Sequence, residues 1–258
     1  MKRKAALVRL ERWPIAALAY HVLAHLDLGR DAANLYDDTL PARPWTAELH
    51  AAYVAAPGRL AIHAAPLWYG DALVQRLRND GPASLRDDAG RTLARAFADA
   101  IEAEAPDFLA GWDRELAPLS DVATIVAEPL NRLRHALWER IGPPPPLVVV
   151  DCPALGQRAR AARCERARMV ATDCAQPIEW LLCQVLHEEI HAVTDASVLA
   201  GRDALTRDTR VGTPGYALHA ELERTAIEVG DALVQARAPE WSTAYADWRR
   251  AVDPSSRA

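Results

Sequence analysis

The sequence predicts a helix-rich α+β fold, with a helical region over residues 1–142 and a metal-binding domain with a small sheet over residues 147–258. Three observations predict it. The first half reads as helices with short breaks, and Pro, Gly or Asp stands near most boundaries. Two short β-branched runs follow. Two long amphipathic stretches complete the pattern, and the first of them carries the string H-E-x-x-H.

The N-terminal region is expected to be helical between its breaks. Its basic start is followed by a short apolar run. Charged residues at positions 9, 11 and 12 interrupt this run, which argues against a signal peptide. The run over 14–28 is too short and too polar to span a membrane, so we expect a cytoplasmic protein. The expected helices cover residues 14–27, 44–56, 59–79, 83–104, 106–117 and 119–141.

Two histidines in the first expected helix, His21 and His25, are four residues apart, but no glutamate follows His21. Residues at this spacing share one face of a helix, so a metal pair is one interpretation. The favoured interpretation is a packed helix with two hydrogen-bonded histidines, because buried histidines are more often satisfied within the core than bound to a metal.

The small sheet is expected from two runs. Residues 147–150 are Leu-Val-Val-Val after a stiff stretch of prolines, and residues 168–172 form a second candidate strand. Between them, residues 157–168 carry five arginines and one acid. We expect this segment to be a solvated hairpin or loop.

The string H-E-x-x-H lies in a predicted helix that begins near Pro177 and contains His187, Glu188 and His191. Two histidines four apart lie one turn apart on the same face, so both imidazoles can hold one metal ion. Zinc suits this set, because a catalytic zinc site has three protein ligands and an open position. The glutamate between them can then act as a base toward the attacking water.

The same helix has a broad apolar face, and both histidines fall on the opposite side with Cys183. We expect that side to line a cleft. The alternative is an amphipathic surface helix with two solvated histidines. The apolar face carries one exception, Glu189, whose carboxylate needs a buried partner, and arginine is the expected one.

A third ligand is expected from the second helical stretch, which begins near Pro214. His219 and Glu223 lie one turn apart inside its apolar arc, whereas Glu221 and Glu228 lie outside it. Polar groups in an apolar arc are costly unless they are paired. A metal would pair them; alternatively, Glu223 pairs with an arginine and His219 is a satisfied core histidine.

These residues resemble the zincin metallopeptidases, in particular the gluzincin branch, in which a later E-x-x-A supplies the third ligand. Here that string begins at Glu223. The resemblance implies that His187, His191 and Glu223 bind Zn²⁺ and that Glu188 is the general base. It also implies a sheet edge beside the metal helix, where an extended peptide can add as a strand. The resemblance covers roughly residues 147–235, and Glu189 departs from the usual apolar or small residue.

The sequence therefore predicts a zinc-dependent hydrolase, with a peptide or protein as substrate. His219 or Tyr216 is expected to donate a hydrogen bond to the developing oxyanion. Two alternatives remain: a zinc enzyme acting on a non-peptide amide, and a non-catalytic helical interaction protein whose metal motif is accidental or degenerate.

Composition sets the outer limits of this prediction. The chain has 258 residues, of which 50% are hydrophobic and 25% charged, as in ordinary soluble globular proteins. Its net charge of −5 gives no electrostatic reason to expect nucleic acid as a partner. The four cysteines lack the C-x-x-C pairs of a structural zinc site, and we expect them to be reduced. The sequence does not indicate an oligomeric state.

Overall fold

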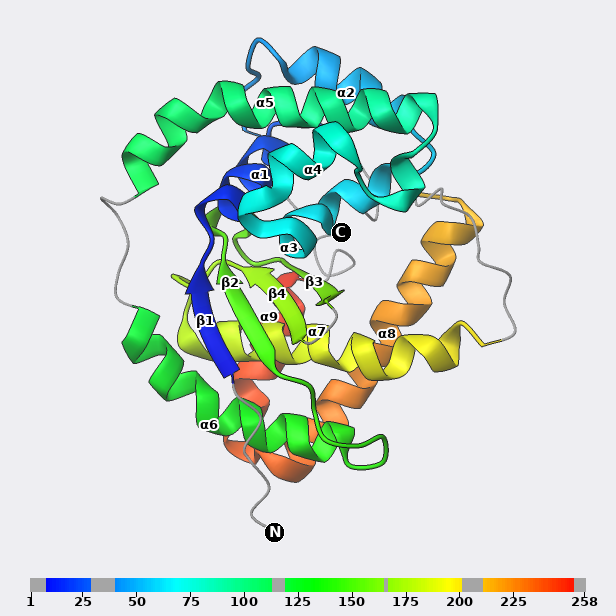
Figure 1. The fold of residues 1–258 in the computed structure, drawn as a ribbon. Coiled ribbons are helices and arrows are strands. Elements are labelled where there is room, and N and C mark those ends of the chain that lie inside the picture. Colours follow the sequence, from blue (N-terminus) through cyan, green and yellow to red (C-terminus); the bar gives the residue numbers. More distant parts are fainter. Residues whose placement is uncertain (1–7, 29–39, 113–118, 165–166, 201–210, 253–258) are drawn as a thin grey trace.

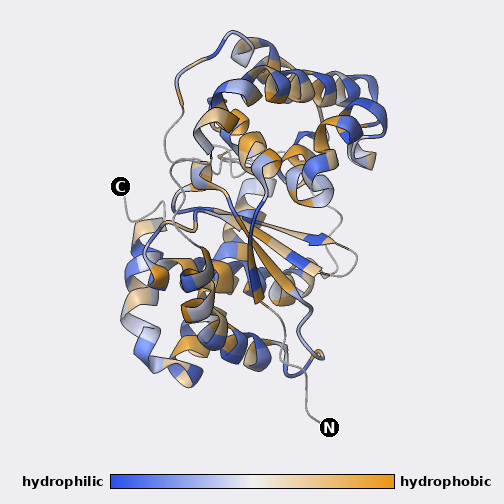
Figure 2. Ribbon diagram, turned by 60° about the vertical axis from the view of Figure 1, so that its left-hand side comes forward, coloured by the Kyte–Doolittle hydropathy of each residue, from blue (hydrophilic) through white to orange (hydrophobic). Residues whose placement is uncertain are grey.

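A four-stranded sheet lies between two layers of helices in the computed structural model, which describes residues 8–28, 40–112, 119–164, 167–200 and 211–252 (Figures 1 and 2). The hydrophobic core has two parts, one on each face of the sheet. No helix of the described residues is both long and apolar enough to cross a membrane. The predicted helix-rich α+β class is confirmed.

The sheet has the strand order β1-β2-β4-β3. Neighbours β1, β2 and β4 are parallel, and β3 is antiparallel to β4, so β1 and β3 are the edges. In this register Val149 pairs with Leu10 on one side and Val170 on the other. The strands are β1 (Val8–Arg12), β2 (Leu147–Asp151), β3 (Ala159–Cys164) and β4 (Ala167–Thr172).

Strand β2 is buried along its whole length, because helices cover both faces of the sheet. Its successive side chains point to opposite faces. Val148 and Val150 therefore belong to the core beneath the first helical layer, and Leu147 and Val149 belong to the core beneath the second. This explains why its sequence is a continuous apolar run without alternation.

The first layer packs α1 and the helices that follow it against one face of the sheet (Figure 1). The expected helix over 59–79 is broken into short pieces, with Gly70 at a positive φ of 51° between two of them. The expected break at Pro106 is wrong, because α5 continues through this proline. The helices are α1 (Pro14–Ala24), α2 (Thr46–Ala55), α3 (Ala65–Tyr69), α4 (Leu73–Asn79) and α5 (Asp88–Trp112).

The second layer is built around α7, which carries H-E-x-x-H. This helix contacts β3 and β4 of the sheet and also α6, α8 and α9. Figure 1 shows it beneath the sheet, with α8 rising beside it. The helices are α6 (Leu119–Trp138), α7 (Ile178–Val198), α8 (Pro214–Arg237) and α9 (Ser242–Val252).

One strand was not expected: residues 8–12, whose charges interrupted the apolar run, form β1. The arginine-rich segment forms a hairpin, one of its two expected forms, and its first strand is β3. Consequently the two predicted strands, β2 and β4, are both interior. The division of the chain between residues 142 and 147 stays a prediction, but β1 and α6, which precede it, pack with the residues that follow it.

A close approach between α8 and α9 depends on Gly230. A Cβ added there would overlap the hydroxyl of Tyr245, which is 1% exposed, and would crowd Ile190 of α7. We expect Gly230→Ala to lower the free energy of unfolding by about 1–3 kcal/mol through overpacking. Gly111→Ala is the matched control, because nothing lies within 4 Å of its added Cβ. It should stabilise helix α5 by up to about 1 kcal/mol. Urea unfolding of both variants measures this, and equal effects would contradict the account.

Candidate metal centre

Three side chains from two helices converge on one point. The Nε2 atoms of His187 and His191 are 3.0 Å apart. The carboxylate of Glu223 lies 3.0 Å from Nε2 of His187 and 3.3 Å from Nε2 of His191. The ligand atoms all lie within 4.8 Å of one another. The structure therefore brings together the three residues that the sequence predicted to share a metal.

The local fold explains this convergence. The histidines are one turn apart on α7, and their rings meet edge to face with centroids 4.6 Å apart. Helix α8 packs against α7 and delivers Glu223 from its side. Thr213 caps the start of α8 by accepting a hydrogen bond from the backbone N–H of Tyr216.

The histidines are more enclosed than the sequence suggested. His187 is 8% exposed, and the ring of Trp248 from α9 lies 5.3 Å from its ring. The expectation that α7 turns this side to an open cleft needs correction, since α8 and α9 cover most of it. The alternative of a surface helix with solvated histidines is also wrong. Solvent reaches the group at Glu223, whose side chain is 37% exposed.

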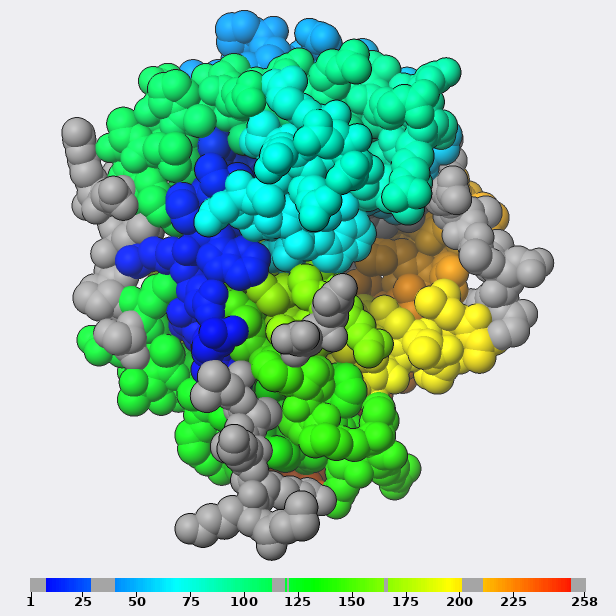
Figure 3. All heavy atoms as spheres, viewed as in Figure 1, coloured from blue at the N-terminus to red at the C-terminus, as the bar shows by residue number. Residues whose placement is uncertain are grey.

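The surface is hollowed beside α7. In Figure 3 a recess lies between the α3–α4 part of the first layer and α7, and α8 is visible at its back.

A carboxylate orients the second histidine. Oδ1 of Asp195 lies 2.9 Å from Nδ1 of His191, one turn further along α7. With Nδ1 donating to Asp195, Nε2 of His191 is left to face the other two groups, the arrangement that metal-binding histidines commonly use. The sequence analysis missed Asp195, although its spacing of four from His191 was a usable signal.

The pKa values of two groups in the triad are shifted by their neighbours. Burial alone would lower the pKa of His191, but hydrogen bonds with Asp195 and Glu223 outweigh it and raise the pKa to about 10. Burial would raise the pKa of Glu223, but its hydrogen bonds with His187 and His191 hold the pKa well below the usual range. The negative groups thus favour positive charge on the imidazole of His191.

The donor set fits a metal ion. Two imidazole nitrogens that face each other at 3.0 Å repel unless a proton or a cation lies between them. Two imidazoles and a carboxylate are ligands that zinc and similar divalent metals accept. The described part of the chain contains a second such group, formed by His21, His25 and Glu104.

The other predicted site residues lie around the triad. Glu188 is half-buried on α7, and its charge also acts on His191. His219 is one turn before Glu223, with Nε2 3.5 Å from its Oε1, and its side chain is 41% exposed. It does not belong to the group of three that the structure assembles. Tyr216 is half-buried at the start of α8.

A buried ion cluster fixes α7 against the sheet and α6. Glu189 is fully buried and receives hydrogen bonds from Nε of Arg134 at 2.7 Å and Nε of Arg168 at 3.2 Å. Arg168 also donates to the backbone carbonyl of Glu188 at 2.9 Å. The expected arginine partner of Glu189 is confirmed. Glu189 lies on α7 between the two histidines, so its ion pairs with Arg134 and Arg168 hold this turn of the helix in position.

The cysteines take no part in this group. All four are free thiols in the structure. Cys183, one turn before His187, is fully buried, and burial raises its pKa to about 12. It is therefore a packed thiol and not a reactive one.

Asp195 offers a test of the orientation it provides. We expect Asp195→Asn to weaken metal binding by about 10- to 100-fold, because the ring of His191 loses its charged partner. Competition with a chelator measures the affinity. Asp247→Asn on α9, whose carboxylate pairs with Arg250, is a matched change that should leave the affinity unaltered. An unchanged affinity in Asp195→Asn would remove this role.

Comparisons with protein-family models, curated proteins and solved structures found no match to this chain.

Proposed function

We propose that this protein is a zinc-dependent hydrolase that cleaves peptide bonds. The observation that carries the proposal is the convergence of His187, His191 and Glu223, with Glu188 placed between the two histidines on the same helix. The string H-E-x-x-H is thereby joined to a third ligand from a different helix. This combination is much more specific than the string alone.

Each residue has a role that its position supports. A zinc ion held by the triad would polarise the scissile carbonyl and lower the pKa of the attacking water. Glu188 accepts the proton of that water and passes it to the leaving amine. His219, partly exposed and next to Glu223, donates a hydrogen bond to the developing oxyanion, and Tyr216 is the second candidate for this task.

An extended peptide is the substrate that the surroundings favour. Strand β3 is an edge of the sheet and contacts α7. Within the described ranges no strand pairs with its outer side. Main-chain hydrogen bonds from such an edge can hold a peptide as an added strand. The hollow beside α7 in Figure 3 supports the same approach. We also propose that the protein acts in the cytoplasm and does not bind nucleic acid, in line with its net charge of −5.

The experiment is digestion of a complex peptide library by the zinc-loaded protein, with new termini identified by mass spectrometry. We expect cleavage that a chelator stops and added zinc restores. Glu188→Gln should bind zinc normally but cleave at least about 100-fold more slowly, since it cannot accept the proton. Absence of new termini from zinc-loaded protein would overturn the peptidase proposal. Loss of zinc from Glu188→Gln would instead overturn the role of Glu188.

A further inference from the structure

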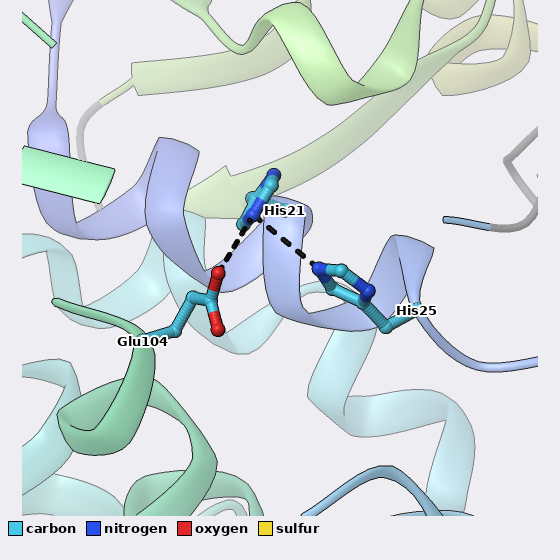
Figure 4. Close-up of side chains that lie close together, drawn as sticks. All are labelled: His21, His25 and Glu104. Carbon is cyan, nitrogen blue, oxygen red and sulfur yellow. Dashed lines mark hydrogen bonds and ion pairs between the residues drawn. The ribbon is translucent and has the colours of Figure 1, made fainter. Parts of the chain in front are cut away.

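A second convergence of two histidines and a glutamate lies on the other side of the sheet (Figure 4). Helix α1 supplies His21 and His25, and α5 supplies Glu104. Nε2 of His21 is 3.3 Å from Oε1 of Glu104 and 3.4 Å from Nε2 of His25. The favoured sequence interpretation, two hydrogen-bonded histidines in a packed helix, did not include the carboxylate.

This group has the geometry of the first one. The rings of its histidines meet at 89° with centroids 4.9 Å apart, compared with 89° and 4.6 Å for His187 and His191. In each pair, Nδ1 of the second histidine is engaged by an oxygen. For His25 this oxygen is the carbonyl of Pro41 at 2.6 Å. A carbonyl only accepts, so Nδ1 of His25 donates to it, which turns Nε2 toward His21.

The separations at His21 suit donors that share one metal ion. Donors of a tetrahedral zinc site, each about 2.0–2.2 Å from the metal, lie roughly 3.3–3.5 Å apart. Both separations at His21 fall within this range. His25 is 3% exposed and Glu104 6% exposed, so both donors are held within the core.

We propose that His21, His25 and Glu104 form a second site for a divalent transition-metal ion. Two imidazoles and one carboxylate select zinc, cobalt(II) or iron(II) over calcium and magnesium, which prefer oxygen ligands. The site joins α1 to α5. His21, whose side chain is 24% exposed, provides the access for the ion. The rings of Phe108 and Trp45 flank the two histidines.

Arg43 regulates the occupancy of this site. Its guanidinium donates to Oε1 of Glu104 at 3.0 Å, the same oxygen that faces His21. A cation bound there must displace the guanidinium or share the carboxylate with it. The Arg43 side chain is 43% exposed and can move into solvent. The guanidinium therefore competes with the metal, and its removal should tighten metal binding. An ion-pair network that binds no metal gives no such effect.

The test is zinc titration of chelator-treated protein, with bound zinc counted after gel filtration. Wild type is expected to bind two zinc ions per chain and His21→Ala one. His50→Ala, which changes a half-buried histidine on α2 outside both groups, should still bind two. Glu223→Ala should weaken the first site and leave the second intact. Arg43→Gln should bind the second zinc at least about tenfold more tightly, because a competing charge is lost.

The outcomes separate the two sites. One zinc in wild type that persists in His21→Ala but is lost in Glu223→Ala overturns the second site and leaves the proposed hydrolase untouched. One zinc that persists in Glu223→Ala and is lost in His21→Ala supports the second site and removes the first. If His21→Ala does not fold, the second site is tested by the zinc titrations of wild type, Glu223→Ala and Arg43→Gln. An unaltered zinc affinity in Arg43→Gln contradicts the competition by Arg43.

Discussion

Glu223→Ala is expected to weaken zinc affinity by about 100- to 1000-fold. Structural zinc sites bind with about 10–16 kcal/mol over four ligands, so one ligand accounts for about 2.5–4 kcal/mol. The remaining pair, His187 and His191, would hold the ion from α7 alone. Competition with a chelator measures the loss, and circular dichroism establishes that the variant is folded.

Two further variants rank the candidates on α8. His219→Ala should retain the zinc and slow turnover, because His219 lies outside the group of three. Glu228→Ala, an exposed change five residues beyond Glu223 on the same helix, should alter neither property. If His219→Ala releases the zinc while Glu223→Ala keeps it, the site is a three-histidine one and the resemblance to gluzincins fails.

Arg134→Met is expected to lower the free energy of unfolding by about 3–5 kcal/mol, because it removes one partner of a fully buried carboxylate. Arg134 and Glu189 are both 0% exposed, and among the described residues Arg168 would remain as the cation that pairs with Glu189. The shift in the urea midpoint measures the effect. The zinc affinity should fall as well, since Glu189 lies next to the turn that carries the histidines.

The neighbouring Arg132 gives a matched control on the same helix. It pairs with Glu240 at the surface, where both side chains are largely solvated, so Arg132→Met should change stability far less. The double variant Arg134→Met with Glu189→Leu should recover part of the loss, because no uncompensated carboxylate remains. Equal destabilisation by Arg132→Met and Arg134→Met would contradict the assigned importance of the buried cluster.

The candidate site was readable from the sequence where it depended on helix geometry. The spacing of His187 and His191 fixes them on one face whatever surrounds the helix. Glu223 was found because a carboxylate in an apolar arc requires a partner, and the same argument predicted an arginine beside Glu189. Each inference used the chemistry of a buried group, which does not depend on knowing the fold.

The rest of the fold depends on contacts between distant segments. Strand β1 has only a short alternation of apolar and charged residues, and it becomes a strand by pairing with β2, more than 130 residues later. The arginines of β3 made this segment look solvated in the sequence, although the alanines between them pack against the core. Pro106 breaks one hydrogen bond of α5, but Phe108 and Trp112 beyond it still pack against the core. Trp248 reaches His187 from a helix with no local signal for this role.

The most direct test of the metal centre is an anomalous difference map at the zinc edge, from crystals of protein loaded with excess zinc, so that both proposed sites can fill. The account predicts a peak about 2.0–2.2 Å from Nε2 of His187, Nε2 of His191 and one carboxylate oxygen of Glu223. A peak that is absent from this triad, or that is bound by His187 and His191 without Glu223, would contradict it.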